Sequence, residues 1–257
     1  MQKLTIIKVG GKIVEEPDTL AALIADFARI PGLKLLVHGG GRSATRLATQ
    51  LGIEQKMVDG RRITDTDTLR IVTMVYGGLV NKNIVTSLQA EGINAIGLTG
   101  ADMDIIRSHR RPAGEIDYGF VGDVDRVDAQ AIARLLDAGL VPVIAPLSHD
   151  GHGSMLNTNA DTIASEVARA LAPLFDTTLT FCFEKSGVLA DENDDTSVIK
   201  KIDRATYQQL RDRNIIAGGM IPKLDNAFKA LNSGVKEVII TKADAIAVPG
   251  SGTVICD

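Results

Sequence analysis

The sequence predicts an α/β fold, a three-layer α/β/α sandwich with a central, mostly parallel sheet. Short aliphatic runs alternate along the chain with longer segments of helical periodicity, an order that gives parallel strands covered by helices on both faces. Two of these runs end in glycine clusters, Gly10-Gly11 and Gly39-Gly40-Gly41, as strand-to-helix turns do. The 257 residues, 45% of them hydrophobic, are enough for one large domain or for two lobes that share a sheet.

The strands are expected where apolar residues run without a break, because strands of a parallel sheet are buried on both faces. Several of these runs are rich in β-branched residues and are bounded by turn residues. The predicted strands are 4–9, 33–37, 94–98, 140–145, 178–183, 235–241 and 252–255.

The helices are expected where amphipathic segments follow a capping residue and end at glycine or proline. Asp18, Thr64 and Asp128 are the predicted N-caps of the first, third and fourth helices. The predicted helices are 19–29, 42–51, 65–91, 129–139, 159–174, 204–213 and 221–231.

Segment 103–126, with short alternating runs, is predicted to form antiparallel hairpins on the sheet, and segment 53–64 to form a hairpin or an irregular strand. Segment 146–158 is polar and contains glycine, so we predict a loop there and place the boundary between two lobes in it. The lobes are 1–153 and 154–257, and one continuous sheet runs through both.

The composition excludes several classes of protein. A net charge of −4 and a pI near 5.6 give no basic surface for nucleic acid. No apolar run approaches the roughly 18 residues of a membrane span, and Lys8 interrupts the early apolar run where a signal peptide would need continuity. Cys182 and Cys256 suit neither a disulfide framework nor a zinc site. We therefore expect a cytoplasmic protein without metal ligands of its own.

Two glycine clusters are the first candidate site. Lys8 comes just before Gly10-Gly11, and His38 comes just before Gly39-Gly40-Gly41. Glycine lets backbone N–H groups approach an anion closely, and a helix N-terminus adds partial positive charge, so this edge of the sheet suits a phosphate. Lys8 with Gly10-Gly11 alone is better explained as an ordinary turn with a solvated lysine, and it is the second cluster that favours a site. Residues 39–44 also match the weak dinucleotide pattern G-x-G-x-x-A.

The segment Asn157-Thr-Asn-Ala-Asp161 is the second candidate site. One asparagine, Asn157 or Asn159, is expected to cap the helix that follows, and Asp161 suits its first turn. A cap leaves the second asparagine without a role, so we interpret the amides as ligands for a substrate carboxylate or amide. The Asp161 carboxylate would then orient nearby lysines.

Two cations complete the set. Lys223 follows Gly218-Gly219 near the start of a helix, where a cation is unfavourable unless an anion is present. Arg62 offers bidentate binding of a carboxylate, although an exposed hairpin arginine fits the sequence equally well. We expect Lys8 and Lys223 to lie outside the core.

Together these motifs resemble the acetylglutamate kinases of the amino acid kinase family, over residues 3–255. The Lys-x-Gly-Gly start is shared across that family, whereas the Asn-x-Asn-Ala-Asp and Gly-Gly-Met-x-x-Lys motifs indicate this branch. The matching motifs are Lys8-Val-Gly-Gly11, His38-Gly-Gly-Gly-Arg42, Gly60-Arg-Arg-Ile-Thr64, Asn157-Thr-Asn-Ala-Asp161 and Gly218-Gly-Met-Ile-Pro-Lys223.

The resemblance implies ATP-dependent phosphorylation of the γ-carboxylate of an N-acylated glutamate, in arginine biosynthesis, with Mg²⁺ carried by ATP. Lys8 and Lys223 would neutralise the transferring phosphoryl group, and Asp161 would organise both lysines. The residues implied for the ATP phosphates are Gly10, Gly11, Gly39 and Gly40. The residues implied for the acceptor are Gly40, Gly41, Arg62 and Asn157, to which we add Asn159.

The family also implies acceptor binding on the N-terminal lobe, ATP on the C-terminal lobe, and a homodimer formed through helix 65–91. The chain departs from the family pattern at Glu184-Lys185-Ser186, where an Asp-Val-x stretch is usual. Because the first strand starts almost at residue 1, we also expect no N-terminal helix for a hexamer and no inhibition by arginine.

Three alternatives stay open at the level of the sequence. The acyl group can be acetyl, which we predict, or succinyl, which would need one more cation such as Arg107, Arg110 or Arg111. A sibling kinase would act on carbamate, aspartate, free glutamate or a nucleoside monophosphate. A non-catalytic dinucleotide-binding protein would use Gly39 to Ala44 but gives no role to Lys223 or Asp161.

Overall fold

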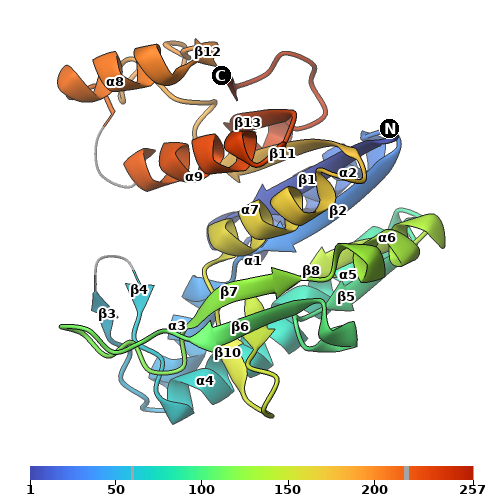
Figure 1. The fold of residues 1–257 in the computed structure, drawn as a ribbon, viewed down its shortest axis with the longest axis vertical. Helices are drawn as coiled ribbons and strands as arrows, with labels where there is room; N and C mark the ends of the chain where they lie inside the picture. The colour runs from blue at the N-terminus through green and yellow to red at the C-terminus, as the bar shows by residue number, and fades with distance from the viewer. Residues whose placement is uncertain (59–60, 217–219, 257) are drawn as a thin grey trace.

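The computed structural model describes residues 1–58, 61–216 and 220–256, so Gly60, Gly218 and Gly219 of the sequence motifs lie outside the described residues. In the described part of the chain, one sheet of eight strands runs through the molecule (Figure 1). Every neighbouring pair is parallel except β13 and β14, which confirms the mostly parallel sheet. The strands, in spatial order, are β12 (Lys201–Ile202), β14 (Thr253–Ile255), β13 (Glu237–Lys242), β11 (Asp176–Phe183), β1 (Lys3–Val9), β2 (Leu33–His38), β8 (Val141–Ile144) and β5 (Ala95–Leu98).

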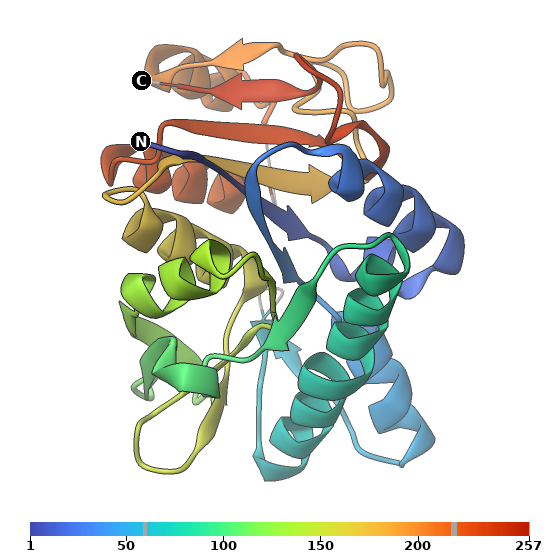
Figure 2. The same cartoon turned by 90° about the vertical axis from the view of Figure 1, so that its right-hand side faces the viewer.

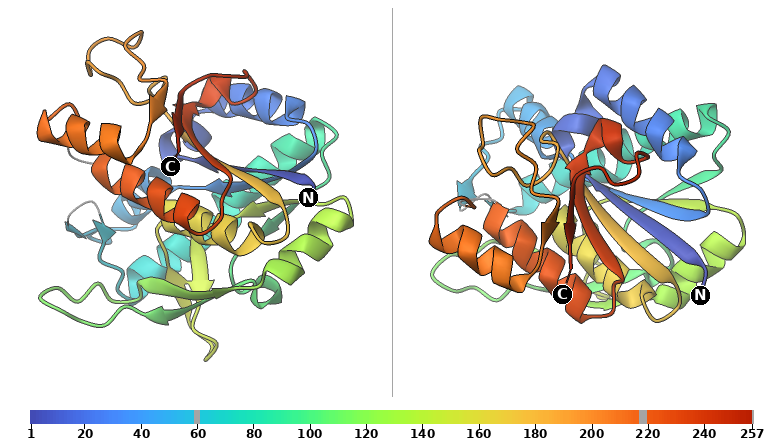
Figure 3. Two further views of the ribbon diagram at one scale, coloured as in Figure 1. Left: turned by 45° about the horizontal axis from the view of Figure 1, so that its top comes forward. Right: turned by 90° about the horizontal axis from the view of Figure 1, so that it is seen from above.

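Helices cover both faces of this sheet. One layer contains α2 (Pro17–Arg29) and the helical run of α4 (Thr66–Val72), η1 (Thr73–Val80) and α5 (Asn81–Ala90); α2 and α5 pack side by side (Figure 2). The opposite layer contains α6 (Ala129–Asp137), α7 (Ala160–Leu171) and α9 (Met220–Asn232), and the view from above shows the sheet as a fan between the two layers (Figure 3). The remaining described helices are α1 (Gly11–Glu15), α3 (Gly41–Gln50) and α8 (Arg204–Asp212). None of the described helices is both long and apolar enough to cross a membrane.

The two-residue period of the strands divides the core between the layers. On β1, Ile6 packs in the core under α7 and α9, whereas its neighbour Ile7 packs in the core under α2 and α5. On β2, Leu35 and Leu36 separate in the same way. Since residues two apart share a face, Lys8 must point toward α7 and α9, as Ile6 does.

Smaller sheets lie beside the central one. The strands β6 (Ile106–Arg110) and β7 (Gly122–Val127) form the hairpin predicted for 103–126, and β3 (Met57–Val58) with β4 (Arg61–Arg62) forms the one predicted for 53–64. The prediction of a loop over 146–158 is wrong. That segment contains β9 (Leu147–His149) and β10 (Met155–Asn157), which pair antiparallel and extend the sheet of β6 and β7. These two strands were not predicted because each has only three residues.

Two predicted helix caps are also wrong. Helix α2 begins at Pro17 with Glu16 as its N-cap, and Asp18 lies inside its first turn. Helix α4 is capped by Asp65, whose side chain accepts from the Thr68 N–H at 2.8 Å, because the Thr64 hydroxyl is buried and bonded elsewhere. Within the helix predicted for 65–91, the middle segment η1 is a π-helix.

The first 144 residues supply β5, β8, β2 and β1, and residues from 176 onward supply β11, β13, β14 and β12. β1 and β11 pair along the whole of β1, so the sheet is continuous where the two halves meet. The division into lobes 1–153 and 154–257 stays a prediction.

Candidate active site

The two glycine clusters touch each other backbone to backbone. The register of β1 and β2 pairs Val9 with His38, so both strands reach the same edge of the sheet together. The Gly39 N–H donates to the Val9 carbonyl at 3.0 Å, and a Cβ built on Gly39 would lie 2.9 Å from the Gly11 nitrogen. No side chain fits between the two loops, so glycine is required at this position.

The space beside Gly11 is lined by backbone nitrogens. A Cβ built on Gly11 would lie 3.1 Å from the Gly40 nitrogen and 3.2 Å from the Gly41 nitrogen. Helix α3 starts there with Gly40 as its N-cap and without a side-chain cap on that residue. Glu15 instead bonds the third amide of the helix, at 2.8 Å from the Ser43 nitrogen. The geometry offers a small cradle of amide nitrogens at the positive end of α3.

Lys8 and Asp161 meet next to this cradle. Lys8 Nζ lies 2.6 Å from Asp161 Oδ1, and the two side chains are 8% and 17% exposed. Asp161 is in the first turn of α7, which packs against β1. The expectation that Lys8 lies outside the core is wrong, since the whole residue is only 7% exposed. It is a buried cation paired with a carboxylate that is only partly exposed.

Lys223 reaches the same point from the start of α9. Its Nζ lies 3.4 Å from the ring centroid of Phe183, and Lys8 Nζ lies 5.8 Å from the same centroid. The pKa of Lys223 is lowered mainly by burial; the negative charge of Asp161 opposes this shift, and the positive charge of Lys8 adds to it. Among the described residues, no carboxylate lies within 4.0 Å of Lys223 Nζ, so Asp161 contacts one lysine directly and acts on the other through its field. Glu184 also acts on Lys223 but is paired with Lys12 at 2.7 Å, so the three lysines and two carboxylates leave net positive charge for an anion.

Arg62 is a second buried cation, not an exposed hairpin residue. It is 9% exposed, and its Nη2 donates to the Gly41 carbonyl and to Thr45 Oγ1, each at 2.9 Å, while Nη1 donates to Gln55. All of these acceptors are neutral, and none of the described carboxylates pairs with Arg62. A buried guanidinium held only by neutral groups is suited to bind a carboxylate of a ligand.

The two asparagines have different roles. Asn159 caps α7, with its Oδ1 accepting from the N–H groups of Asp161 at 2.8 Å and Thr162 at 3.2 Å. Asn157 donates from Nδ2 to Thr64 Oγ1 at 2.9 Å, and Thr64 in turn donates to the Arg62 carbonyl. Asn157 therefore lies beside Arg62, whereas the carbonyl group of Asn159 is already used by the helix.

The structure brings most of the predicted residues to one edge of the sheet. Sequence reasoning missed the supporting residues Glu15, Phe183 and Thr64. Phe183 had one available signal, because it is the last residue of β11. That strand lies next to β1, in which Lys8 is the second-last residue. The other two act through contacts distant in sequence, which a single sequence does not reveal.

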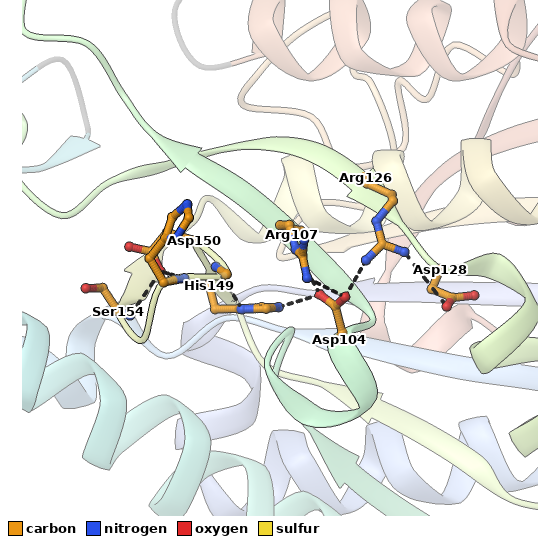
Figure 4. Close-up of polar contacts among 9 residues, drawn as sticks. Asp104, Arg107, Arg126, Asp128, His149, Asp150 and Ser154 are labelled. Carbon is orange, nitrogen blue, oxygen red and sulfur yellow. Dashed lines mark hydrogen bonds and ion pairs between the residues drawn. The ribbon is translucent and has the colours of Figure 1, made fainter.

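The three hairpin arginines have partners of their own. Arg107 binds the Asp104 carboxylate, with 2.7 Å between Nη2 and Oδ2, together with Arg126 and His149 (Figure 4). Arg111 binds Asp123 in a bidentate contact. Arg110 lies over the Phe120 ring at 4.8 Å and has no described carboxylate closer than 3.8 Å. Of the three, Arg110 has the longest ion pair, 3.8 Å from Asp117, and its Nε donates to the Gly119 carbonyl at 2.7 Å.

Comparison with known proteins agrees with this geometry. The model of the amino acid kinase family matches residues 3–242. The chain belongs to the amino acid kinase family. It is 68% identical over 254 residues to a protein of Phocaeicola vulgatus named acetylglutamate kinase, covering 99% of this chain and 98% of that one. It is 38% identical to a protein of the same name from Methanopyrus kandleri, covering 98% and 100%.

Solved structures of other proteins have a similar fold. A crystal structure of a Streptococcus mutans protein matches with a TM-score of 0.79 and 30% identity over 98% of each chain. A carbamate kinase from Giardia matches with a TM-score of 0.68 over 100% of this chain and 99% of that one; at 15% identity it supports the fold alone. The predicted amino acid kinase fold is confirmed.

Proposed function

We propose that this chain is an ATP-dependent kinase that phosphorylates the γ-carboxylate of N-acetyl-L-glutamate, giving N-acetylglutamyl 5-phosphate and ADP, in arginine biosynthesis. The observation that carries the proposal is the Lys8–Asp161 ion pair beside the amide cradle of Gly40 and Gly41. Relatives named acetylglutamate kinase, up to 68% identical over nearly the full chain, support the choice of acceptor.

The reaction moves a phosphoryl group from one oxygen to another and needs no covalent enzyme intermediate. Lys8 and Lys223 stabilise the charge on the transferring group from the side of α7 and α9. Asp161 holds the Lys8 ammonium group in place, at 2.6 Å. The glycines Gly10, Gly11, Gly39 and Gly40 allow the ATP phosphates to approach the backbone closely. Catalysis then consists of positioning and preorganised charge.

Arg62 and Asn157 hold the acceptor. The Arg62 guanidinium binds its α-carboxylate, because Arg62 is buried without a described acidic partner. Asn157 binds the acyl-amide side, and the Gly40–Gly41 backbone assists. We assign Asn159 to the cap of α7, with its exposed side chain as a weaker candidate contact.

Mg²⁺ would arrive on the nucleotide and reduce the negative charge of its phosphates. Among the described residues no cluster of three or more His, Cys, Asp or Glu side chains is arranged to hold a metal ion, and Asp161 is paired with Lys8. The phosphates would therefore be the main ligands of the ion.

The protein would work as a cytoplasmic homodimer. The π-helix η1 exposes Met74 and Leu79, at 52% and 53%, on the outside of the helical layer. Two large apolar side chains close together on a helix suit contact with a second copy. We place acceptor binding and dimerisation on lobe 1–153 and ATP binding on lobe 154–257, with Asn157 reaching the acceptor from just beyond the boundary.

The test is ADP release, measured with a coupled assay over a panel of acceptors: N-acetylglutamate, N-succinylglutamate, glutamate, aspartate and carbamate. We expect the highest kcat/KM with N-acetylglutamate and none above background with the Asp161→Asn variant. Faster turnover of free glutamate, aspartate or carbamate would replace the proposed acceptor by that of a sibling kinase. Absence of ADP release with every acceptor would refute the proposed reaction.

A further inference from the structure

A buried polar pair lies directly beneath the second glycine loop. His38, the last residue of β2, is fully buried, and Asn81, the first residue of α5, is 1% exposed. Asn81 directly follows the π-helix η1. Both are surrounded by an aliphatic core, where polar groups are unfavourable unless they are hydrogen-bonded. The proposed reaction gives neither residue a role.

The contacts of this pair fix the position of one proton. Asn81 Nδ2 donates to the Val143 carbonyl at 2.9 Å and lies 3.1 Å from His38 Nε2. A carbonyl can only accept, so the Asn81 NH₂ group must face both neighbours and Nε2 must be the acceptor. Burial lowers the pKa of His38 to about 4, so the ring is neutral at pH 7 and carries its single proton on Nδ1. That proton is donated to the Gly39 carbonyl, 2.7 Å away.

The pair is not arranged for stability alone. Asn81 Oδ1 is buried and has no hydrogen-bond partner among the described residues. It lies above Gly97, where a built Cβ would be 1.9 Å away, so this glycine is required to make room for the amide. An unpaired buried oxygen is a cost that an apolar pair of the same shape would avoid.

The bond to Gly39 determines how the loop presents its next N–H group. In a trans peptide unit the C=O and N–H bonds point in opposite directions. With the Gly39 carbonyl turned inward to His38, the Gly40 N–H is turned outward, to the space beside Gly11. Tyr76 of η1 blocks the other side, since a Cβ on Gly40 would lie 2.9 Å from its Cδ1.

We propose that His38 and Asn81 are positioning residues for phosphoryl transfer, which hold the Gly39–Gly40 peptide so that its N–H group faces the transferring phosphate. Asn81 sets the tautomer of His38, and His38 Nδ1–H anchors the Gly39 carbonyl. A preorganised donor of this kind stabilises charge that develops in the transition state, so its effect is on kcat more than on KM. The inference rests on the proposed kinase reaction.

The test compares two amides at one position. In His38→Asn the side-chain NH₂ can take the place of Nδ1 and keep the bond to Gly39, whereas in His38→Gln the amide reaches toward Asn81 and the bond to Gly39 is lost. Both variants replace a buried ring by an amide, so each is a stability control for the other. We expect kcat to fall about 10- to 100-fold in His38→Gln and no more than about threefold in His38→Asn, with the KM for ATP nearly unchanged in both.

Equal losses of kcat in the two variants, or wild-type kcat in His38→Gln, would overturn the inference. These outcomes are distinct from failure of the proposed function, in which the wild-type protein itself releases no ADP. If either variant does not fold, ¹⁵N–¹H correlation of the histidine rings in the wild-type protein decides. A proton on Nδ1 of His38 at pH 7.5 agrees with the anchor, and a proton on Nε2 excludes it.

Discussion

Lys8 and Asp161 are 153 residues apart in the chain, and their charged atoms lie 2.6 Å apart. The strand period turns Lys8 to the face that α7 covers, and the cap at Asn159 fixes the first turn of α7 that carries Asp161. The pair places a lysine, held by its partner, beside the glycine loops.

Replacing Arg62 should weaken binding of the acceptor and not of ATP. We expect Arg62→Lys to raise the KM for N-acetylglutamate roughly 30- to 150-fold, the equivalent of about 2–3 kcal/mol for charged hydrogen bonds, because a lysine cannot make a bidentate contact. The neighbouring Arg61 is exposed, and Arg61→Lys serves as the matched control. A larger change in the KM for ATP than for the acceptor would place Arg62 at the nucleotide instead.

The acyl group can be tested through Arg110. We expect N-acetylglutamate to give a higher kcat/KM than N-succinylglutamate, and Arg110→Ala to leave the acetyl reaction within about threefold of wild type, as is usual for an exposed side chain away from the reacting atoms. Arg107→Ala is the control, since Arg107 is committed to Asp104. If N-succinylglutamate were preferred and Arg110→Ala abolished that preference, the acyl assignment would be wrong and the kinase assignment would stand.

The stability of the fold should fall in mild acid because of His38. Its pKa is about 4 in the fold and near 6.5 when unfolded, so below pH 6.5 the unfolded chain takes up a proton that the native state refuses. Stability is complete above pH 6.5 and is lost as the pH falls toward 4, by about 2 kcal/mol between pH 7 and pH 5. Urea unfolding of wild type and His38→Asn at both pH values measures this contribution. Equal pH dependence of the two proteins would contradict a buried, neutral His38.

The proposed dimer depends on the exposed side chains of η1. We expect Met74→Glu combined with Leu79→Glu to convert the dimer to a monomer in sedimentation velocity, because two charges would have to be buried at the interface. Met57→Glu, at a residue equally exposed on the β3–β4 hairpin, should leave the dimer intact. A wild-type monomer or hexamer would refute the dimer directly.

Much of this site could be predicted from local patterns. The strand before Gly10-Gly11 and the helix after Asn159 have clear signals in composition and capping, and so the positions of Lys8 and Asp161 follow from the fold class. The burial of Arg62 could not be predicted, because it depends on Gly41, Thr45 and Gln55 closing around a two-residue strand.

The contacts that support the glycine loops also could not be predicted from the sequence. Asn81 reaches His38 only because η1 and α5 pack on β2 and β8, and nothing within a few residues of either signals the pair. The five-residue helix α1 and the short strands β9 and β10 fall below the length at which periodicity is informative. Tertiary packing, not local preference, determines these features.

The central claim is that Lys8 and Lys223 stabilise the transferring phosphoryl group, and the most direct measurement is kcat and the KM for ATP in Lys8→Met and Lys223→Met. Loss of one preorganised charge contact typically costs about 3–4 kcal/mol, so we predict a fall of roughly 10²–10³-fold in kcat with a smaller change in KM, and little rescue by arginine.

Lys34→Met is the matched control. Lys34 is a buried lysine on β2 whose Nζ donates to three carbonyls at the end of α2, so its loss should lower stability and leave kcat unchanged. A kcat near that of wild type in both Lys8→Met and Lys223→Met, with the fold intact by circular dichroism, would contradict the mechanism.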